Sequence, residues 1–205
     1  MIEIFCFVNV VFFINGLFKG RKKMNISEFL EVVKWRHSCR AYDATKTVSD
    51  EAINNCLVAV NNAPSACNRQ PARWIIVKDE KVRRELHKRG ILPGLPMPWI
   101  DDAPVIAVLC AKSNLLVHWF APILSKVPYY LVDSGIAGEH FALAAAAQGL
   151  GTCWLGWINP KGIKQVLGIP AGIQPIAMFT LGYPKEKKEA VAKLPLEEIV
   201  HYDRW

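Results

Sequence analysis

One segment constrains the fold more than any other. Residues 133–151, DSGIAGEHFALAAAAQGLG, are dominated by small side chains. The stretch predicts a helix with an alanine-rich face, and this helix should end at Gly149 or Gly151. Because small side chains allow close backbone approach, we expect the helix to be buried in the core, in a subunit interface, or in both. A buried strand is predicted directly after it, over residues 152–157.

The size and composition of the chain indicate one globular domain. Its 205 residues are enough to bury a full hydrophobic core. Hydrophobic residues make up 52% and charged residues 21%, which argues against disorder. The sequence contains no internal repeat and no linker, so we expect a single domain over residues 24–205.

The chain is basic, with a net charge of +7 and a pI of about 9.1. Such a balance permits binding to nucleic acid or to a membrane surface. Much of the charge comes from residues 21–23 and 185–193, however, and no RNA-binding, zinc-finger or helix-turn-helix motif accompanies it. We therefore expect no nucleic-acid partner. An anionic cofactor, or solubility alone, accounts better for the charge.

The cysteine pattern favours a reducing compartment. No two cysteines form a C-x-x-C pair, and no cysteine–histidine cluster has the spacing of a zinc site. We expect free thiols in a cytoplasmic protein, without a metal site or a disulfide framework. The six cysteines are Cys6, Cys39, Cys56, Cys67, Cys110 and Cys153.

Residues 1–23 are predicted to lie outside the domain. Residues 4–18 are apolar but interrupted by Asn9 and Asn15, and the run is shorter than the roughly 20 residues of a membrane span. A signal peptide would begin with a basic region, which is absent here. Three alternatives stay open: a segment upstream of a true start at Met24, a membrane anchor, or a docked arm. We favour the first and do not expect membrane association.

Cap and stop signals predict the remaining helices. Ser49 is a candidate N-cap, Gly90 a candidate C-cap, and Asn159 a cap before a proline at the first helical position, with Gly168 at the end. The helices are expected over residues 25–36, 49–63, 79–89, 133–149, 160–167 and 196–200.

Apolar runs predict strands over residues 74–77, 105–110, 152–157 and 176–181. Residues 91–103 are expected to form a loop, and residues 111–128 show no clean period. Taken alone, the alternation of helices and strands favours a parallel α/β sheet.

No self-sufficient catalytic set is present. The sequence has no nucleophile elbow, no zinc-protease motif and no phosphate loop. The glycine-rich stretch GLGTCWLGW follows a helix and leads into a strand, the reverse of a dinucleotide fingerprint. The histidines at 87, 118, 140 and 201 lack metal-site spacing, and we expect them to be structural or exposed. A chain of this kind can instead hold a cofactor that does the chemistry.

Residues 36–40, RHSCR, gather hydrogen-bond donors in five positions. Cations are common at helix ends, where they complement the helix dipole, so the cluster alone is more typical of a helix end. The alternative is an anion site, since a guanidinium group forms bidentate, charge-assisted bonds with phosphate.

Four stretches, in order, resemble the motifs of the nitroreductase family of FMN-dependent oxidoreductases. RHSCRAYD is similar to the family's R-[RH]-S-x-R motif, and NNAPSACNRQPARWIIV to its A-P-S-x-x-N-x-Q-P-W motif; residues 133–157 and LGYP at 181–184 follow. The resemblance covers residues 24–205. It implies an α+β fold, with a mainly antiparallel sheet of four to five strands flanked by helices. It also implies an intertwined homodimer with two FMN sites at the interface.

The resemblance further implies which residues contact FMN. Arginine and serine donors near residue 38 would bind the phosphate and the pyrimidine side of the ring, and the backbone around Gly156 would lie near flavin N5. Residues 64–68 come from the partner subunit in the family. The implied contacts are Arg36, His37, Ser38, Arg40, Pro64, Ser65, Asn68, Gln70, Leu155, Gly156 and Lys193.

Some details of this site stay open. Lys185, Lys187 and Lys188 are alternatives to Lys193 as the phosphate contact in the tail. Cys39 is expected to be a spacer that points inward. Ala72 follows Pro71 where the family often has an aromatic residue, which leaves the local ring packing undecided.

The implied reaction is a two-step exchange. NADH or NADPH delivers hydride to flavin N5, and a small-molecule acceptor, such as a nitroaromatic or a quinone, then takes the electrons. No catalytic residue is needed from the protein. The alternatives are a flavin-fragmenting or dehalogenating relative, a non-catalytic flavin-binding protein, and a membrane-associated redox partner. Acceptor specificity is expected to depend on residues 91–128.

Overall fold

The computed structural model describes residues 25–112, 127–186 and 191–205. Its contacts divide the chain into two units, residues 1–31 and 32–205. Only residues 25–31 of the first unit are described, and they begin helix α2 (Ile26–Trp35), close to the predicted range. The predicted boundary at residues 23 and 24 lies outside the described part. Everything that follows concerns the second unit.

Four strands form one sheet in the order β1-β2-β4-β3. They are β1 (Ala72–Val77), β2 (Val105–Lys112), β3 (Gly151–Leu155) and β4 (Ile173–Gly182), and every pair of neighbours is antiparallel. This confirms the antiparallel α+β fold, whereas the parallel sheet indicated by the alternation of elements is wrong. Val77 pairs with Ile106, so the chain leaves β1 and enters β2 at the same end of the sheet. The connection between β1 and β2 therefore returns to the end of the sheet that it left. A crossover helix between parallel strands would instead carry the chain to the opposite end.

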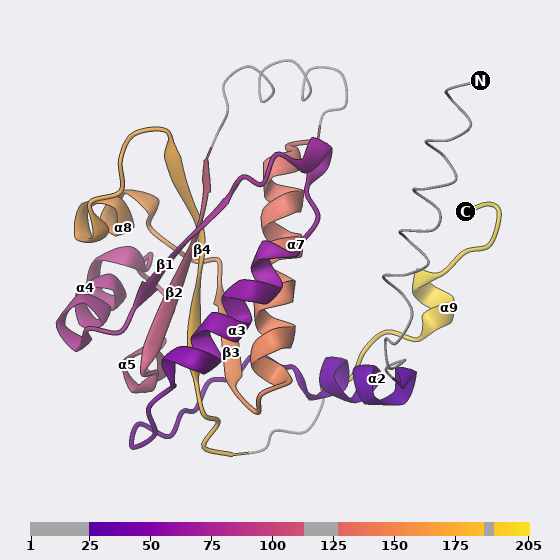
Figure 1. Cartoon of the computed structure of the whole chain (residues 1–205), viewed down its shortest axis with the longest axis horizontal. Helices are drawn as coiled ribbons and strands as arrows, with labels where there is room; N and C mark the ends of the chain where they lie inside the picture. The colour runs from indigo at the N-terminus through magenta and orange to yellow at the C-terminus, as the bar shows by residue number, and fades with distance from the viewer. Residues whose placement is uncertain (1–24, 113–126, 187–190) are drawn as a thin grey trace, which may run out of the picture. The chain divides into compact units, whose positions relative to one another are not determined.

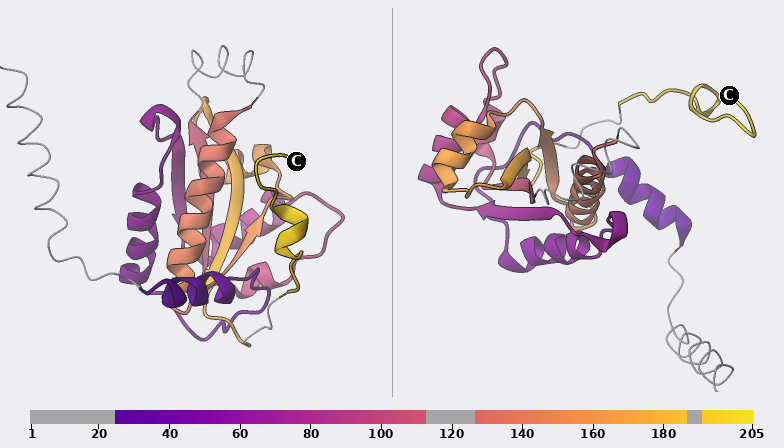
Figure 2. Two further views of the ribbon diagram at one scale, coloured as in Figure 1. Left: turned by 90° about the vertical axis from the view of Figure 1, so that its right-hand side faces the viewer. Right: turned by 90° about the horizontal axis from the view of Figure 1, so that it is seen from above.

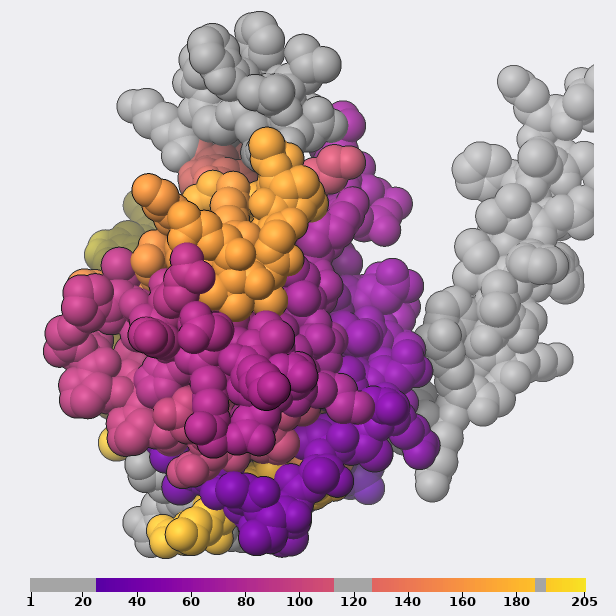
Figure 3. Space-filling view, turned by 90° about the vertical axis from the view of Figure 1, so that its left-hand side faces the viewer, coloured from indigo at the N-terminus to yellow at the C-terminus, as the bar shows by residue number. Residues whose placement is uncertain are grey.

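Helices cover both faces of the sheet (Figure 1 and Figure 2). Helices α3 (Asp50–Asn61) and α7 (Tyr129–Ala146) pack together on one face. Helices α4 (Glu80–Gly90), α5 (Trp99–Asp102) and α8 (Pro160–Leu167) lie on the other face. In Figure 3 the side chains of α4 and α8 form a closed surface over that second face. Two short helices, η1 (Ala66–Asn68) and α9 (Leu196–Ile199), are the other helices of the described residues.

Two hydrophobic clusters fill the spaces between these layers. Phe141, Phe179 and Leu109 belong to the cluster beneath α3 and α7, and Leu86, Ile163 and Met178 belong to the one beneath α4 and α8. Strand β2 contributes to both, and seven of its eight residues are buried. Burial on both faces explains why its sequence, VIAVLCAK, reads as a continuous apolar run.

Helix α7 confirms the predicted burial of the alanine-rich segment. Ala137, Ala142 and Ala145 are buried. The helix begins at Tyr129, four residues before the predicted start at Asp133, and Asp133 is itself buried inside it. It ends at Ala146, and Gly149 then takes a left-handed φ of 74° in the turn that leads to β3.

Local cap predictions are confirmed at three positions. Ser49 Oγ accepts from Ala52 N at 3.1 Å, and Asn159 Oδ1 accepts from Gly162 N at 3.3 Å. Gly168 ends α8 with a φ of 63°. Gly90 is the exception, because it is the last residue of α4 and not its C-cap. It is buried against α8, where a Cβ atom would lie 2.9 Å from Ile163 Cγ1.

Other predictions concern a loop, a strand boundary, the membrane and the cysteines. Residues 91–103 contain the short helix α5, and β3 covers residues 151–155 instead of 152–157. Among the described residues, no helix is long and apolar enough to cross a bilayer. The five cysteines in the described part of the chain form no disulfide. Cys6, residues 4–18 and residues 113–126 lie outside the described residues.

Candidate functional site

The RHSCR segment lies beside edge strand β3. Ser38 forms a parallel β-bridge with Thr152, and Cys39 N donates to Thr152 O at 2.8 Å. Cys39 is buried against Tyr42 and Ala103, as expected for a spacer that points inward. The backbone of the segment is therefore fixed to the sheet while its other side chains stay accessible.

Two glycines make this close approach possible. Gly151 and Gly182 are partners across β3 and β4. A Cβ atom on Gly151 would lie 2.8 Å from Cys39 Sγ, and one on Gly182 would lie 2.9 Å from Tyr42 Cδ1. Both distances are too short for any side chain at these positions. Gly151 of GLGTCW thus leaves room for Cys39 of RHSCR, and Gly182 of LGYP leaves room for Tyr42 just after it, so three of the four sequence motifs are in contact.

The two arginines of the segment lie in different environments. Arg36 Nε is 3.3 Å from Glu139 Oε1 on α7, an ion pair. The same Nε atom is buried and has no hydrogen-bond partner among the described residues. Arg40 is exposed, and its guanidinium carbon lies 5.7 Å from the ring centroid of Trp99. Arg40 offers a free edge to an anion, and the ion pair of Arg36 leaves its two outer nitrogens available for a fork.

Opposing effects act on the pKa of the Cys153 thiol, which lies on β3. Burial raises the pKa of Cys153, while the positive charge of Arg40 and the hydroxyl of Ser38 act in the opposite direction. His37 is half-buried, and its Nδ1 lies 2.9 Å from Trp35 O.

The second predicted group lies in the loop between α3 and β1. Ser65 Oγ accepts from Gln70 N at 2.8 Å, and Asp133 Oδ1 accepts from Ala66 N at 3.0 Å. Gln70 Nε2 donates to Asn68 Oδ1 at 2.9 Å. These bonds shape the loop into a compact turn, with Pro64 exposed at its start.

Three non-glycine residues of this turn have left-handed backbone conformations. The φ angles are 51° at Cys67, 52° at Asn68 and 48° at Gln70. Such angles cost free energy for residues with a Cβ atom, although asparagine tolerates them better than most. Strain of this kind gathers at functional sites in proteins. The turn thereby presents the amide groups of Asn68 and Gln70 at the surface.

The third predicted group follows the end of β3. Leu155 is buried and Gly156 is exposed. The next residue, Trp157, donates from Nε1 to Pro93 O at 3.1 Å, and its carbonyl oxygen accepts from Leu92 N at 3.2 Å. The loop that begins at residue 91 is therefore fixed beside Gly156.

The predicted residues form two groups within one chain. Residues 36–40 and 155–156 lie along β3, whereas residues 64–70 lead into β1. Strands β3 and β1 are the two opposite edges of the sheet. Lys193 is exposed in the described C-terminal segment.

Sequence reasoning missed the acidic partners on α7 and the role of Tyr42. Glu139 pairs with Arg36 and Asp133 fixes the turn at Ala66. Both are acidic residues on a helix dominated by small side chains, which was a usable signal. Tyr42 is buried, and its hydroxyl donates to Cys39 O at 3.0 Å.

The histidines have local partners. His87 Nδ1 is 2.9 Å from Asp101 Oδ1, His140 Nδ1 is 2.9 Å from Ile136 O, and the ring of His201 packs on Trp205. His118 lies outside the described residues. Within the described ranges, no group of histidine, cysteine and acidic residues could hold a metal ion.

Comparison with known proteins agrees with the motifs. The model of the nitroreductase family matches residues 33–183. An Archaeoglobus fulgidus protein, provisionally named NADH dehydrogenase/NAD(P)H nitroreductase, is 34% identical over 171 residues, covering 80% of this chain and 90% of its own. The FMN reductase [NAD(P)H] of Bacillus subtilis is 29% identical over 192 residues, covering 88% of this chain and 75% of its own.

A solved structure is similar across most of the chain. The structure of a hypothetical oxidoreductase from Bacillus subtilis matches with a TM-score of 0.75 and 29% identity, covering 89% of this chain and 75% of that one. The family match spans more than half of the chain and contains the RHSCR segment, the strained turn and the end of β3. The chain therefore belongs to the nitroreductase family.

Proposed function

We propose that this protein is an FMN-dependent NAD(P)H oxidoreductase that passes electrons to a small organic acceptor, such as a nitroaromatic or a quinone. The observation that carries the proposal is that the segment holding Arg36, Ser38 and Arg40 pairs with edge strand β3, which ends beside the exposed Gly156. Relatives named as an FMN reductase and as NAD(P)H nitroreductases support the choice of cofactor and electron donor.

The residues present fit FMN. Arg36 Nε faces the Glu139 carboxylate, so the two outer nitrogens of Arg36 and the exposed guanidinium of Arg40 are the donors left for an anion. A phosphate group would satisfy such donors with short, charge-assisted bonds. When bound, FMN supplies the redox chemistry, since it accepts a hydride from NAD(P)H and returns two electrons to the acceptor.

The residues of the chain then have separate tasks. Arg36, Ser38 and Arg40 bind the anionic part of the cofactor, and their positive charge favours added electron density nearby. Gly156 lets the cofactor approach the backbone, and His37 holds the turn between the helix and the sheet through its bond to Trp35 O. The amides of Asn68 and Gln70 offer donors and acceptors to a heteroaromatic edge. Lys193 supplies a further cation in the tail.

We propose that the active form is a homodimer, with each site completed by the partner subunit. The support is geometric, because the two groups of predicted contacts lie at opposite edges of one sheet. Exposed apolar residues are also available for an interface. Leu131 and Val132 on α7 are 42% and 46% exposed, and Leu196 and Trp205 near the C-terminus are 68% and 102% exposed.

We also propose a cytoplasmic location, supported by buried thiols without disulfides at Cys39, Cys56, Cys110 and Cys153.

The spectrum of the purified full-length protein tests this function. The protein should be yellow and release FMN on denaturation. NADPH or NADH should bleach the flavin absorbance under anaerobic conditions, and a nitroaromatic should restore it. Full recovery of the spectrum separates this activity from a flavin-fragmenting enzyme, and bleaching separates it from a passive binder. Colourless protein that does not bind added FMN would refute the proposal.

A further inference from the structure

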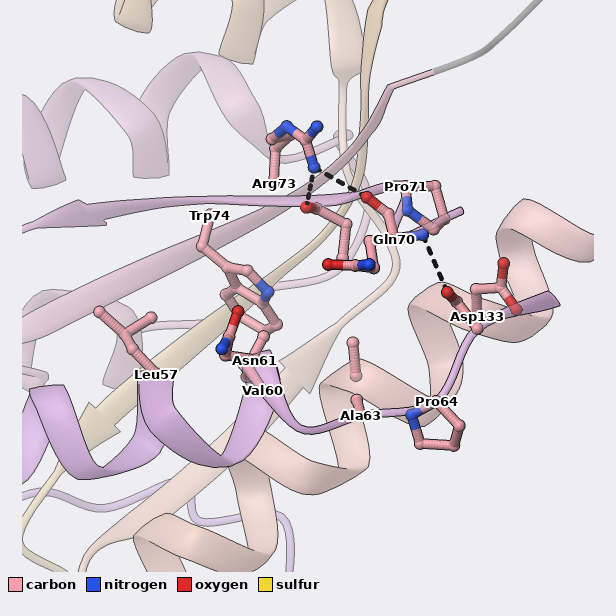
Figure 4. A pocket seen from close by; sticks show the side chains of 13 residues that line it. Leu57, Val60, Asn61, Ala63, Pro64, Gln70, Pro71, Arg73, Trp74 and Asp133 are labelled. Atoms are coloured by element: carbon pink, nitrogen blue, oxygen red, sulfur yellow. Dashed lines mark hydrogen bonds between the residues drawn. The ribbon is translucent and has the colours of Figure 1, made fainter. Parts of the chain in front are cut away.

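A cavity of about 240 Å³ lies between the end of α3, the turn after it, the start of β1 and the first half of α7 (Figure 4). Leu57, Val60, Ala72 and Ala137 give it apolar walls. Apolar cavities of about 150 Å³ hold a benzene ring, so this one has room for a single ring with a substituent. The small side chain of Ala72 helps to keep the space open.

The indole of Trp74 gives the cavity a polar contact. Trp74 Nε1 is buried and has no hydrogen-bond partner among the described residues. In Figure 4 this nitrogen points toward the interior of the cavity. Nearly all buried donors in proteins are hydrogen-bonded, so this N–H is available to an acceptor that enters the cavity.

The indole is held firmly in this orientation. Its ring stacks on Phe141 with a centroid distance of 4.8 Å and an interplanar angle of 18°, and it contacts Phe179 at 5.4 Å. Because these aromatic contacts belong to the core, Trp74 cannot turn to find another acceptor without disturbing the packing. The donor is therefore preorganised for a group that enters the cavity.

The charges around the cavity select against an anion. Asp133 lines the wall opposite Trp74 and is 6% exposed. Arg73 belongs to the same lining, but its Nη1 donates to the carbonyl oxygens of Gln70 and Ala72 at 2.8 Å, and Figure 4 shows the side chain directed away from the cavity. A negatively charged ligand would thus meet a carboxylate without a facing cation.

We propose that this cavity binds a small, flat, uncharged ring that carries an oxygen acceptor, with Trp74 Nε1 as the donor to that oxygen. Pro64, Ser65 and Gln70, three predicted FMN contacts, line the same cavity. The ring is accordingly the electron acceptor of the reaction, a role that rests on the proposed function. Trp74 is then a specificity-determining residue that favours single rings with a nitro or carbonyl oxygen.

Binding can be followed at the indole itself. The chain has seven tryptophans, and ¹⁵N labelling gives each a separate indole N–H signal in NMR spectra. Trp74→Phe assigns the Trp74 signal by its disappearance. Nitrobenzene is the suitable probe, since a quinone would alkylate the exposed thiol of Cys67. Titration of the full-length protein should shift the Trp74 signal until it saturates.

The molecule contains a matched internal control. Trp99 Nε1 is also buried without a hydrogen-bond partner among the described residues, but Trp99 begins α5 on the other face of the sheet. Its signal should not move. Toluene, which lacks the oxygen, should produce a smaller shift at Trp74, and benzoate should bind at least tenfold more weakly than nitrobenzene because of Asp133.

Two variants separate the donor from the space. Trp74→Phe keeps an aromatic ring in the core and removes the N–H, so the affinity for nitrobenzene should fall about fivefold. The KM for the enzymatic reduction of nitrobenzene should rise by a similar factor. Ala72→Phe should fill the cavity and abolish the shift at Trp74. Circular dichroism and thermal melting show whether each variant is folded. If Ala72→Phe does not fold, the test of the binding site rests on Trp74→Phe alone.

The outcomes are distinguishable from those of the flavin experiment, because the NMR titration needs no turnover. A Trp74 signal that stays fixed at saturating nitrobenzene overturns the binding site. A shift at Trp74 combined with an unchanged KM in Trp74→Phe overturns the role of the ring as the acceptor. Equal affinities for nitrobenzene and benzoate would overturn the assigned selectivity.

Discussion

Tyr42 and Thr180 meet hydroxyl to hydroxyl, with 2.7 Å between Tyr42 Oη and Thr180 Oγ1. The Tyr42 hydroxyl donates to Cys39 O at 3.0 Å, so it connects the RHSCR segment to strand β4. Both side chains are buried. Burial raises the pKa of Tyr42 well above its ordinary value of 10.0, which keeps the hydroxyl protonated and able to donate.

Replacing Tyr42 with phenylalanine should lower the free energy of unfolding by about 1–3 kcal/mol, because Cys39 O and Thr180 Oγ1 lose a buried partner. FMN retention should also fall, since the segment is less firmly held. Chemical denaturation and flavin content measure the two effects. Thr180→Val and the double variant complete a cycle in which the two losses should not add. Unchanged FMN retention in a destabilised variant would separate anchoring from binding.

Arg36→Ala and Arg40→Ala should each weaken FMN binding about tenfold or more, since each removes a charged donor to the phosphate or the ring. Titration of FMN into the apoprotein, followed by flavin fluorescence, measures the change. Arg84→Ala is a suitable control because Arg84 is exposed on α4, away from β3, and forms an ion pair with Glu80 one turn earlier. If the arginine variants and this control bind FMN with equal affinity, neither Arg36 nor Arg40 contacts the cofactor.

Mixing two damaged proteins tests whether each site needs two subunits. Arg36→Ala damages the β3 half of the site, and Asn68→Ala damages the half next to β1. In a heterodimer of the two variants, one site keeps both native halves and the other site loses both. Mixing after brief unfolding should therefore restore FMN binding to about a quarter of the sites, by random pairing of subunits. No recovery above that of the separate variants would place both halves in one chain.

Gly151→Ala should destabilise the protein by about 1–3 kcal/mol, the usual cost of forcing extra atoms into a packed site. The added Cβ atom would lie 2.8 Å from both Cβ and Sγ of Cys39. Cys39→Ala in the same chain should recover only part of the loss, because its own Cβ atom remains. Thermal melting of the single and double variants measures this coupling. Equal stability of Gly151→Ala and wild type would refute the close approach.

Buried thiols predict a loss of stability in alkali. Burial raises the pKa of Cys56 and of Cys110 from 9.0 to about 11. In the unfolded chain these thiols ionise near pH 9, whereas in the folded protein they stay protonated to about pH 11, so the folded state is favoured fully below pH 9. As the pH rises between these limits, each thiol should therefore lower the free energy of unfolding by up to about 1.4 kcal/mol per pH unit. Denaturation at stepped pH measures the slope, and Cys56→Ala should make it shallower; a flat profile would contradict the assignment.

Much of the local structure follows from the sequence, because it depends on neighbours in the chain. Ser49, Asn159 and Gly168 cap their helices as their types and positions predict. Gly90 was misjudged because its reason is tertiary, namely the contact with Ile163 across two helices. The early start of α7 was hidden because Tyr129 to Val132 lack the small residues that marked the rest of the helix.

Strand direction and the site depend on longer-range relations. No local pattern within residues 72–112 indicates that the chain returns to the end of the sheet that it left. The alternation of helices and strands alone therefore favoured parallel strands. The family resemblance supplied the direction and named the cofactor contacts. It did not reveal the pair of Arg36 with Glu139, which joins residues about 100 positions apart, or the open space beside Ala72.

The strand order also has a consequence for synthesis on the ribosome. Both β1 and β2 are synthesised by residue 112, but the other neighbour of β2 is β4, which begins at residue 173, some 60 residues later. At roughly 5–20 residues per second, this delay is about 3–12 s. During that interval VIAVLCA presents an unpaired apolar edge, which is the kind of segment that associates with other nascent chains. Slow translation of residues 113–172 should thus increase aggregation, and a chaperone that shields exposed strands should increase yield.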